Sequence, residues 1–230
     1  QIAQGRILGP FESPNYLAMY IAPLIVALII IYFKNTTLSY LKRFIFPLVG
    51  TFSVTLILTQ SFSSIIAVFL AIAFYFALQS KKKWWYLGLA VIILAFGLFF
   101  INKINIKSGS IAARNEIYHA ALRIGTFHSL RGIGPGNFPK YFIELPIQNR
   151  INFEALHPHD IFLAFWVYMG WPGLICFLAI IYLSLRKRNF AKNPVFYFML
   201  LTILLNGLTD TTFFKNDLSV IFWVLVAFLI

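Results

Sequence analysis

Residues 44–78 read FIFPLVGTFSVTLILTQSFSSIIAVFLAIAFYFAL and contain no charged side chain. The polar pair Gln60-Ser61 divides this stretch into two apolar runs of nearly equal length. A helix needs about 20 predominantly apolar residues to cross a hydrocarbon core about 30 Å thick, and each run approaches that length. The stretch therefore predicts two membrane-spanning helices, residues 44–59 and 62–78, joined by a tight turn into a helical hairpin.

The rest of the chain has the same character. Of its 230 residues, 60% are hydrophobic and 11% are charged, and the mean hydropathy is +0.81. Soluble domains average about 45–50% apolar and about 25% charged residues, so secretion, disorder and a water-soluble enzyme are excluded. The lone cysteine, Cys176, excludes a disulfide framework and a cysteine-based zinc site. Because the chain starts at Gln1 without an initiator Met or a signal peptide, we expect it to be the C-terminal part of a longer protein.

The hydrophobic runs predict an all-α, polytopic membrane protein in which residues 1–230 form a single membrane domain. About seven transmembrane helices are expected, at residues 16–33, 44–59, 62–78, 85–101, 161–183, 194–208 and 218–230. One connection is much longer than the others, the loop 102–160.

The charges orient the predicted spans, because short cytoplasmic loops concentrate Lys and Arg. One side receives ten cations and no acid: Lys34, Lys42, Arg43, Lys81, Lys82, Lys83, Arg186, Lys187, Arg188 and Lys192. This side is predicted to be cytoplasmic, so the N-terminus, the tip at Gln60-Ser61, loop 102–160 and turn 209–217 lie outside the cytoplasm. Topology and anionic lipid thus explain most of the net charge of +12 without a nucleic acid partner.

Loop 102–160 holds all four histidines and seven cations, so we expect the chemistry there. Residues 111–126 have a helical pattern, with Ile111, Arg114 or Asn115, Tyr118, Leu122 and Gly125 three or four apart. On this helix Arg114, Tyr118 and Leu122 would share one face, with Arg123 near that face.

A break follows the predicted helix at Gly132-Ile133-Gly134-Pro135-Gly136. The alternate glycines Gly132, Gly134 and Gly136 permit positive φ angles and a close backbone approach. Residues 139–156 are expected to be irregular. Further on, Gly170-Trp171-Pro172-Gly173 should kink the span 161–183 and bring a neighbouring helix or loop close.

Two motifs of the loop have competing interpretations. The glycines at 132–136 resemble a phosphate-binding loop but lack its spacing and strand–helix context, so a turn is favoured. His157-Pro158-His159-Asp160 offers two imidazoles and a carboxylate, which are suitable zinc ligands. Ligands on either side of a proline converge poorly and no second half-site completes them, so a metal-free role or a simple helix entry is favoured.

Arg114 and Arg123 are candidates for binding an anion, because a guanidinium is permanently charged and pairs with phosphate oxygens bidentately. One isolated arginine would more simply be solvated or paired with Glu116. Two arginines, a glycine break and two histidines in one loop favour a site for a polyanion. Asp210 either faces a cavity or ends a helix, and the sequence leaves both alternatives open.

Four segments of the chain resemble conserved blocks of the O-antigen ligase and polymerase family. They are GRILGPFESPNYLA at 5–18, RNEIY at 114–118 with Arg123, GIGPGNF at 132–138, and HPHDIFL at 157–163 with GWPG at 170–173. The resemblance covers most of the chain, and the segments keep the family's order relative to the spans.

The resemblance implies a GT-C-like glycosyltransferase of the bacterial inner membrane. Such enzymes take a glycan from undecaprenyl pyrophosphate at the external face and pass it to lipid A-core, to another lipid-linked repeat or to a protein hydroxyl. They are held to need no metal, and we expect no cofactor. The large extracytoplasmic loop, here 102–160, closes over the site. The family's functional histidine corresponds to His159 and its loop arginine to Arg114.

One position departs from the family pattern. Relatives often carry Ser-Arg at the hairpin tip, where the arginine is thought to contact the pyrophosphate, but here Ser61 is followed by Phe62. Either another cation takes this role, Arg123 being the candidate, or the substrate geometry differs, or activity is reduced.

The expected reaction is displacement at the anomeric carbon, with an acceptor hydroxyl attacking and the pyrophosphate leaving. Arg114 and Arg123 are assigned to the charge that grows on the leaving group. His159 is assigned as the base or acceptor-orienting group, with His157 in support and Asp160 as a candidate to orient His159. The prenyl chain would lie in a groove between helices.

Two other classes of protein remain as alternatives. A transporter or flippase for a lipid-linked or anionic substrate usually places ionisable residues near the middle of its spans, whereas these spans are almost free of charge. An assembly protein would use loop 102–160 to dock a partner. The concentration of polar residues in one loop favours an enzyme acting at the membrane surface.

Overall fold

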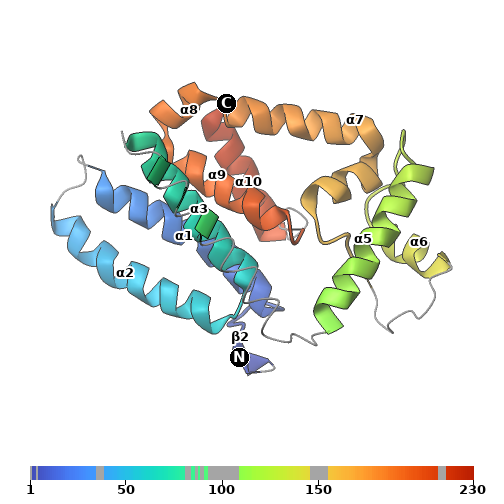
Figure 1. The fold of residues 1–230 in the computed structure, drawn as a ribbon, viewed down its shortest axis with the longest axis horizontal. Helices are drawn as coiled ribbons and strands as arrows, with labels where there is room; N and C mark the ends of the chain where they lie inside the picture. The colour runs from blue at the N-terminus through green and yellow to red at the C-terminus, as the bar shows by residue number, and fades with distance from the viewer. Residues whose placement is uncertain are drawn as a thin grey trace.

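The computed structural model describes residues 2–3, 5–34, 39–80, 84–85, 88, 91–92, 109–145, 155–211 and 216–230. These residues are almost entirely helical, as predicted (Figure 1). The helices are α1 (Pro14–Phe33), α2 (Ser39–Leu58), α3 (Phe62–Gln79), α5 (Gly109–Phe127), α6 (Phe138–Glu144), α7 (Ile161–Ser184), α8 (Lys187–Lys192), α9 (Pro194–Gly207) and α10 (Asn216–Leu229). Two-residue strands, β1 (Ile2–Ala3) and β2 (Arg6–Ile7), form an antiparallel hairpin that the sequence did not predict.

Within the described residues, four helices are long and apolar enough to cross a membrane: α1, α2, α3 and α7. Helices α9 and α10 are apolar but shorter. A multi-pass membrane protein is therefore confirmed. The predicted span 85–101 lies largely outside the described residues, so the number of seven spans stays a prediction.

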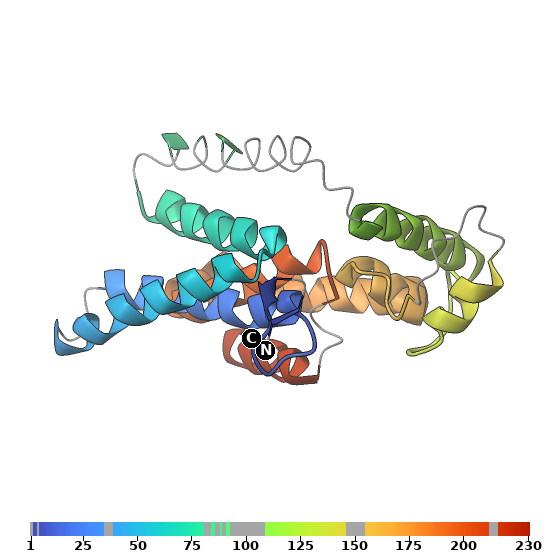
Figure 2. The same cartoon turned by 90° about the horizontal axis from the view of Figure 1, so that it is seen from below.

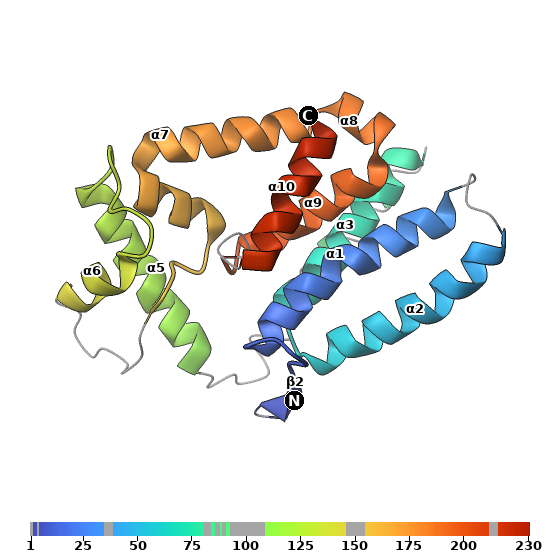
Figure 3. The same cartoon turned by 180° about the vertical axis from the view of Figure 1, so that it is seen from behind.

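Helix α1 is at the centre of the bundle and packs against α2, α3 and α9 (Figure 3). Ala18, Ala22 and Val26 follow one another every four residues on one face of α1 and are fully buried. Small side chains at this spacing let helix backbones approach closely, which is how helices associate in lipid. Helix α2 is mostly exposed at the edge of the bundle, as a lipid-facing helix would be.

The hairpin predicted between α2 and α3 is present. Its turn is made by Thr59 and Gln60, and Gln60 adopts a positive φ of 52° that reverses the chain. Thr59, Ser61 and Ser64 are buried, so the tip packs against other parts of the protein. The Ser61 hydroxyl donates to the Ser64 hydroxyl at 3.2 Å at the start of α3.

Helix α7 is broken at Gly170, as the Gly-Trp-Pro-Gly motif predicted. Gly170 has φ 67° and ψ −170°, so residues 161–169 and 171–184 form two helical arms at an angle (Figure 1). The break also frees backbone groups. In a continuous helix the N–H of Trp171 would bond to the carbonyl of Val167, and Pro172 has no N–H for the carbonyl of Tyr168.

The glycine turn after α5 supplies partners for those freed groups. The N–H of Ile133 donates to the carbonyl of Val167 and that of Gly134 to the carbonyl of Tyr168, both at 2.9 Å. In return the N–H of Trp171 donates to the carbonyl of Ser129 at 2.8 Å. The turn and the α7 break therefore lock together through backbone hydrogen bonds, which satisfies polar groups that lipid would leave unpaired.

The expectation that residues 139–156 are irregular is wrong for the first part of this range, which belongs to helix α6. Phe138–Glu144 form a short helix that starts with Pro139 in its first turn, where a proline is tolerated. Phe138 and Phe142 lie one turn apart and are buried against a cluster that includes Ile117 and Ala121 of α5. Residues 146–154 lie outside the described part of the chain. Helices α5 and α6 thus form a small unit beside the bundle, next to α7 (Figure 2).

Candidate functional site

Four segments far apart in the sequence meet at one end of the bundle: the start of the chain, the α2–α3 tip, the α5–α7 region and the turn after α9. Arg6 contacts Thr59, which joins the start of the chain to the tip. His159 and Arg114 both contact Asp210, which joins the α5–α7 region to the turn after α9, and the charge of Arg114 also acts on Arg6. The charge distribution predicted that these segments share one side of the membrane. The structure brings them to one end of the bundle, and the side of the membrane on which they lie stays a prediction. The C-terminal end of α1 and the N-terminal end of α2 lie at the opposite end (Figure 1).

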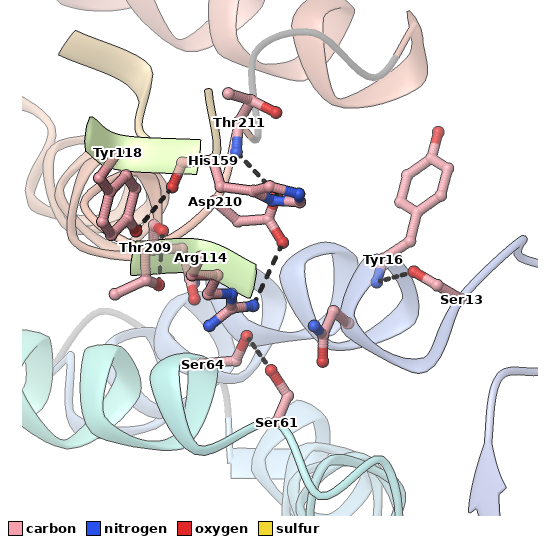
Figure 4. A network of polar contacts seen from close by, with 12 residues as sticks. Ser13, Tyr16, Ser61, Ser64, Arg114, Tyr118, His159, Thr209, Asp210 and Thr211 are labelled. Atoms are coloured by element: carbon pink, nitrogen blue, oxygen red, sulfur yellow. Dashed lines mark hydrogen bonds and ion pairs between the residues drawn. The ribbon is translucent and has the colours of Figure 1, made fainter. Parts of the chain in front are cut away.

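His159 and Asp210 form the centre of this site. The Nδ1 atom of His159 lies 3.1 Å from Oδ1 of Asp210 (Figure 4). The same oxygen accepts the N–H of Thr211 at 2.8 Å. Because Nδ1 faces the carboxylate, the other ring nitrogen, Nε2, is the one left for a substrate.

Asp210 is held as a carboxylate by its surroundings. Burial by itself would raise its pKa, but the hydrogen bonds and charges of its neighbours outweigh this and lower the pKa below its usual value. The hydrogen bond and charge of His159 contribute most to the lowering, followed by the Thr211 N–H and the charge of Arg114. The sequence left the role of Asp210 open, and the structure puts it inside the site.

The backbone at His159 has a φ of 55°, in the left-handed region. Few residues other than glycine adopt this region, although asparagine, aspartate and histidine do so more often than the rest, and it carries a modest cost in strain. The carbonyl of His159 accepts the hydroxyl of Tyr118 on α5 at 3.1 Å. Strain of this kind is found where the surrounding structure fixes a side chain in place for function.

Asp160 does not orient His159, so that expectation is wrong. Its Oδ1 instead accepts the N–H of Leu163 at 2.7 Å, which caps the first turn of α7. An aspartate directly before an apolar helix is well suited to this, because its carboxylate satisfies an otherwise unpaired backbone donor. Neighbours in sequence therefore point in different directions here.

Arg114 joins the site from α5. Its Nη2 lies 3.9 Å from Oδ2 of Asp210, and its side chain is 29% exposed. This distance is an ion pair but exceeds that of a hydrogen bond, so the contact leaves guanidinium N–H donors available. The proposed pairing of Arg114 with a phosphate group remains compatible with this geometry.

Arg123 and His157 lie apart from the His159–Asp210 pair. Nine residues separate Arg114 from Arg123, which is about two and a half helical turns, so they occupy opposite faces of α5. Arg123 is exposed, and the expectation that it lies near the face of Arg114 is wrong. The Nδ1 of His157 is 3.4 Å from the hydroxyl of Tyr168 on α7 instead.

Arg6 is a cation of the site that the sequence did not single out. Its Nε donates to the carbonyl of Thr59 at the hairpin tip, and its Nη2 donates to Oδ1 of Asn15, both at 2.7 Å. Partial burial, and then the positive charge of Arg114, lower the pKa of Arg6. Arg6 belongs to the segment GRILGPFESPN, whose family resemblance could have pointed to it. The sequence does not show that this segment contacts the hairpin tip.

The three loop glycines all adopt positive φ, as expected: 67° at Gly132, 80° at Gly134 and 81° at Gly136. Of the three, only Gly132 also lies against the backbone of another element, because a Cβ there would lie 2.4 Å from the backbone of Tyr168. In the part of the chain that the structure describes, no three potential His, Cys, Asp or Glu ligands gather as a metal site. Metal independence itself stays a prediction.

The comparisons with known proteins agree with these features. A sequence model described as O-antigen ligase matches residues 46–178, which is more than half of the chain. The matched region includes the α2–α3 tip, Arg114, the glycine turn and His159, whereas Arg6 and Asp210 lie outside it. No curated protein matches the chain.

Proposed function

The chain belongs to the O-antigen ligase family of multi-pass membrane proteins, and from this we propose that it transfers a glycan from undecaprenyl pyrophosphate to an acceptor hydroxyl at the external membrane surface. The acceptor is lipid A-core, a growing polysaccharide or a protein, in the biosynthesis of surface polysaccharide. The observation that carries this proposal is the His159–Asp210 pair with Arg114 beside it, because it joins a base to a phosphate-binding cation.

His159 acts as the base. With Nδ1 on the Asp210 carboxylate, the imidazole keeps its proton on Nδ1 and offers Nε2 to the acceptor hydroxyl. The carboxylate also stabilises the imidazolium that forms when His159 takes the proton. The position of Asp210 between His159 and Arg114 keeps the base and the cation at a fixed separation.

In the proposed step the acceptor O–H bond breaks and its proton goes to Nε2 of His159. The acceptor oxygen forms a bond to the anomeric carbon, while the bond from that carbon to the pyrophosphate oxygen breaks. The electron pair leaves with undecaprenyl pyrophosphate. Arg114 stabilises the negative charge that grows on this leaving group more strongly in the transition state than in the ground state.

We propose Arg6, in place of Arg123, as the second cation for the pyrophosphate. It is hydrogen-bonded to the hairpin tip, where relatives carry an arginine and this chain carries Phe62. Burial and then the charge of Arg114 lower the pKa of Arg6, so the two guanidinium groups are close enough to repel each other. A pyrophosphate between them would relieve their mutual repulsion.

Arg6→Gln is expected to lower kcat/KM for the lipid-linked donor by about 10- to 100-fold, since a charge-assisted hydrogen bond contributes about 1.5–3 kcal/mol. Arg123→Gln is the matched control, because the same charge is removed from the exposed face of α5. Steady-state kinetics in proteoliposomes measure both. Equal losses in the two variants would reject Arg6 as the specific partner of the pyrophosphate.

The activity itself is tested by incubating the purified protein with a lipid-linked glycan and measuring released undecaprenyl pyrophosphate. Arg114→Ala and His159→Ala are expected to abolish release while protein levels in the membrane stay unchanged. A transporter or flippase would move the intact lipid-linked glycan and release no pyrophosphate. Unchanged release in both variants would reject these two residues as the machinery.

A further inference from the structure

The last residue of α5 and the turn that follows it, residues 127–131, carry two large apolar side chains that are mostly exposed. Phe127 is 74% exposed and Leu130 is 73% exposed. They flank Ser129, whose carbonyl holds the N–H of Trp171 in α7. Exposed cations lie on either side, Arg123 before the turn and Arg131 at its end. In water such a cluster would be unfavourable.

The depth of this turn in the membrane can be estimated from the length of the second arm of α7. Residues 171–184 rise about 21 Å at 1.5 Å per residue. Arg186 follows directly and lies over the ring of Tyr182 at 5.2 Å, as expected at the cytoplasmic interface next to the cluster of basic residues. A hydrocarbon core is about 30 Å thick, so an arm that starts at its inner edge ends about 9 Å short of its outer edge.

Trp171, the first residue of the second arm, therefore lies inside the outer leaflet. A tilt of the arm would place Trp171 deeper in the membrane. Because the N–H of Trp171 is bonded to Ser129 at 2.8 Å, the 127–131 turn is held at the same depth. The second arm of α7 also carries exposed apolar side chains, at Trp171, Ile175 and Leu178.

Several backbone groups in and directly after the turn are paired within the protein, which lowers the cost of placing them near lipid. The N–H groups of His128 and Gly132 bond to the carbonyls of Ile124 and His128, and those of Ile133 and Gly134 bond to α7. Long cationic side chains such as Arg123 and Arg131 can reach the lipid phosphates from this depth.

We propose that the 127–131 turn is inserted into the outer leaflet and contacts lipid, so that it anchors the α5–α6 unit to the membrane. This inference does not depend on the proposed glycan transfer. Its consequence is that Arg114, at the other end of α5, is held at a fixed height above the bilayer.

Spin labelling tests the insertion in proteoliposomes that contain anionic lipid. Phe127→Cys and Leu130→Cys are each made in a Cys176→Ser background, which removes the single native cysteine. Two references bracket the result. A label on native Cys176, which is exposed on the second arm of α7, reports lipid, and a label on Lys140→Cys, which is exposed on α6, reports water.

For each spin label, the measured quantity is its accessibility to oxygen divided by its accessibility to a water-soluble nickel chelate. This ratio is expected to be the same at positions 127, 130 and 176. At these positions it should exceed the ratio at position 140 several-fold. Access of the nickel chelate at 127 and 130 equal to that at 140 would overturn insertion. Exclusion of both reagents would also overturn it, because a protein segment and not lipid would then cover the turn.

Discussion

Asp210→Asn is expected to lower the rate of glycan transfer by about 10²- to 10⁴-fold, the range attributed to general acid–base catalysis. The carboxylate of Asp210 accepts from Nδ1 of His159, and this fixes which ring nitrogen faces the substrate. An amide can present its NH2 group to Nδ1 instead, which would put the proton on Nε2 and leave it unable to act as a base. Loss of the charge also removes the partner of Arg114.

Asp160→Asn is the matched control for this prediction. It makes the same chemical change in the residue next to His159, but Asp160 only caps α7, and asparagine caps a helix about as well as aspartate. Transfer by this variant should stay close to wild type. Release of undecaprenyl pyrophosphate under single-turnover conditions measures both variants. A full rate in Asp210→Asn, or a comparable loss in Asp160→Asn, would contradict the assignment.

Gly132→Ala is expected to destabilise the protein by about 2–5 kcal/mol and to abolish transfer. About 1–2 kcal/mol comes from forcing a side chain into the left-handed conformation, and overpacking typically adds about 1–3 kcal/mol. The added Cβ would lie 2.4 Å from backbone atoms of Tyr168, which have little freedom to move. The same holds for Gly170→Ala, whose Cβ would meet the carbonyl of Leu130 at 2.4 Å.

Transfer is lost because the two glycines join the parts of the site. Arg114 belongs to α5 and His159 precedes α7, and the backbone bonds beside Gly132 and Gly170 connect these elements. Separating them would move the cation away from the base. A displacement of even about 1 Å can cost about 10²-fold in rate.

Gly136→Ala separates the cost of the left-handed backbone conformation from the cost of the steric overlap with α7. Gly136 has a φ of 81°, but a Cβ there would have no other atom within 4 Å. This variant should lose only the conformational part, about 1–2 kcal/mol, and retain transfer. Thermal unfolding in detergent is the measurement, with a drop of roughly 10 °C expected for Gly132→Ala and a much smaller one for Gly136→Ala. Equal drops would show that the contact with α7 is not important.

Several features of the fold follow from local sequence and were predicted. The charge-free stretch 44–78 gave the α2–α3 hairpin, because a backbone in lipid must form its hydrogen bonds within a helix. The helical spacing within residues 111–126 predicted α5, and the Gly-Trp-Pro-Gly motif predicted the break in α7. Local chemistry decides each of these, so no knowledge of distant residues was needed.

The errors concern residues whose role depends on direction or on distant partners. Arg123 was placed near Arg114, although nine residues along a helix lead to the opposite face. Asp160 was a candidate to orient His159 because it is adjacent, but its carboxylate accepts a backbone N–H in the first turn of α7. Helix α6 was missed because its two buried phenylalanines form a helix only when α5 is there to cover them.

The sequence by itself determined that this protein is a multi-pass membrane protein, and it predicted that its polar segments gather on one side. Hydrophobic length and the placement of charge are properties of single segments, so they can be read without a tertiary structure. The tertiary structure alone decided which of the gathered groups touch. Arg6 reaches Thr59, and Asp210 reaches His159 and Arg114, across large separations in sequence. Such contacts depend on how the helices pack, and packing is a property of the whole fold.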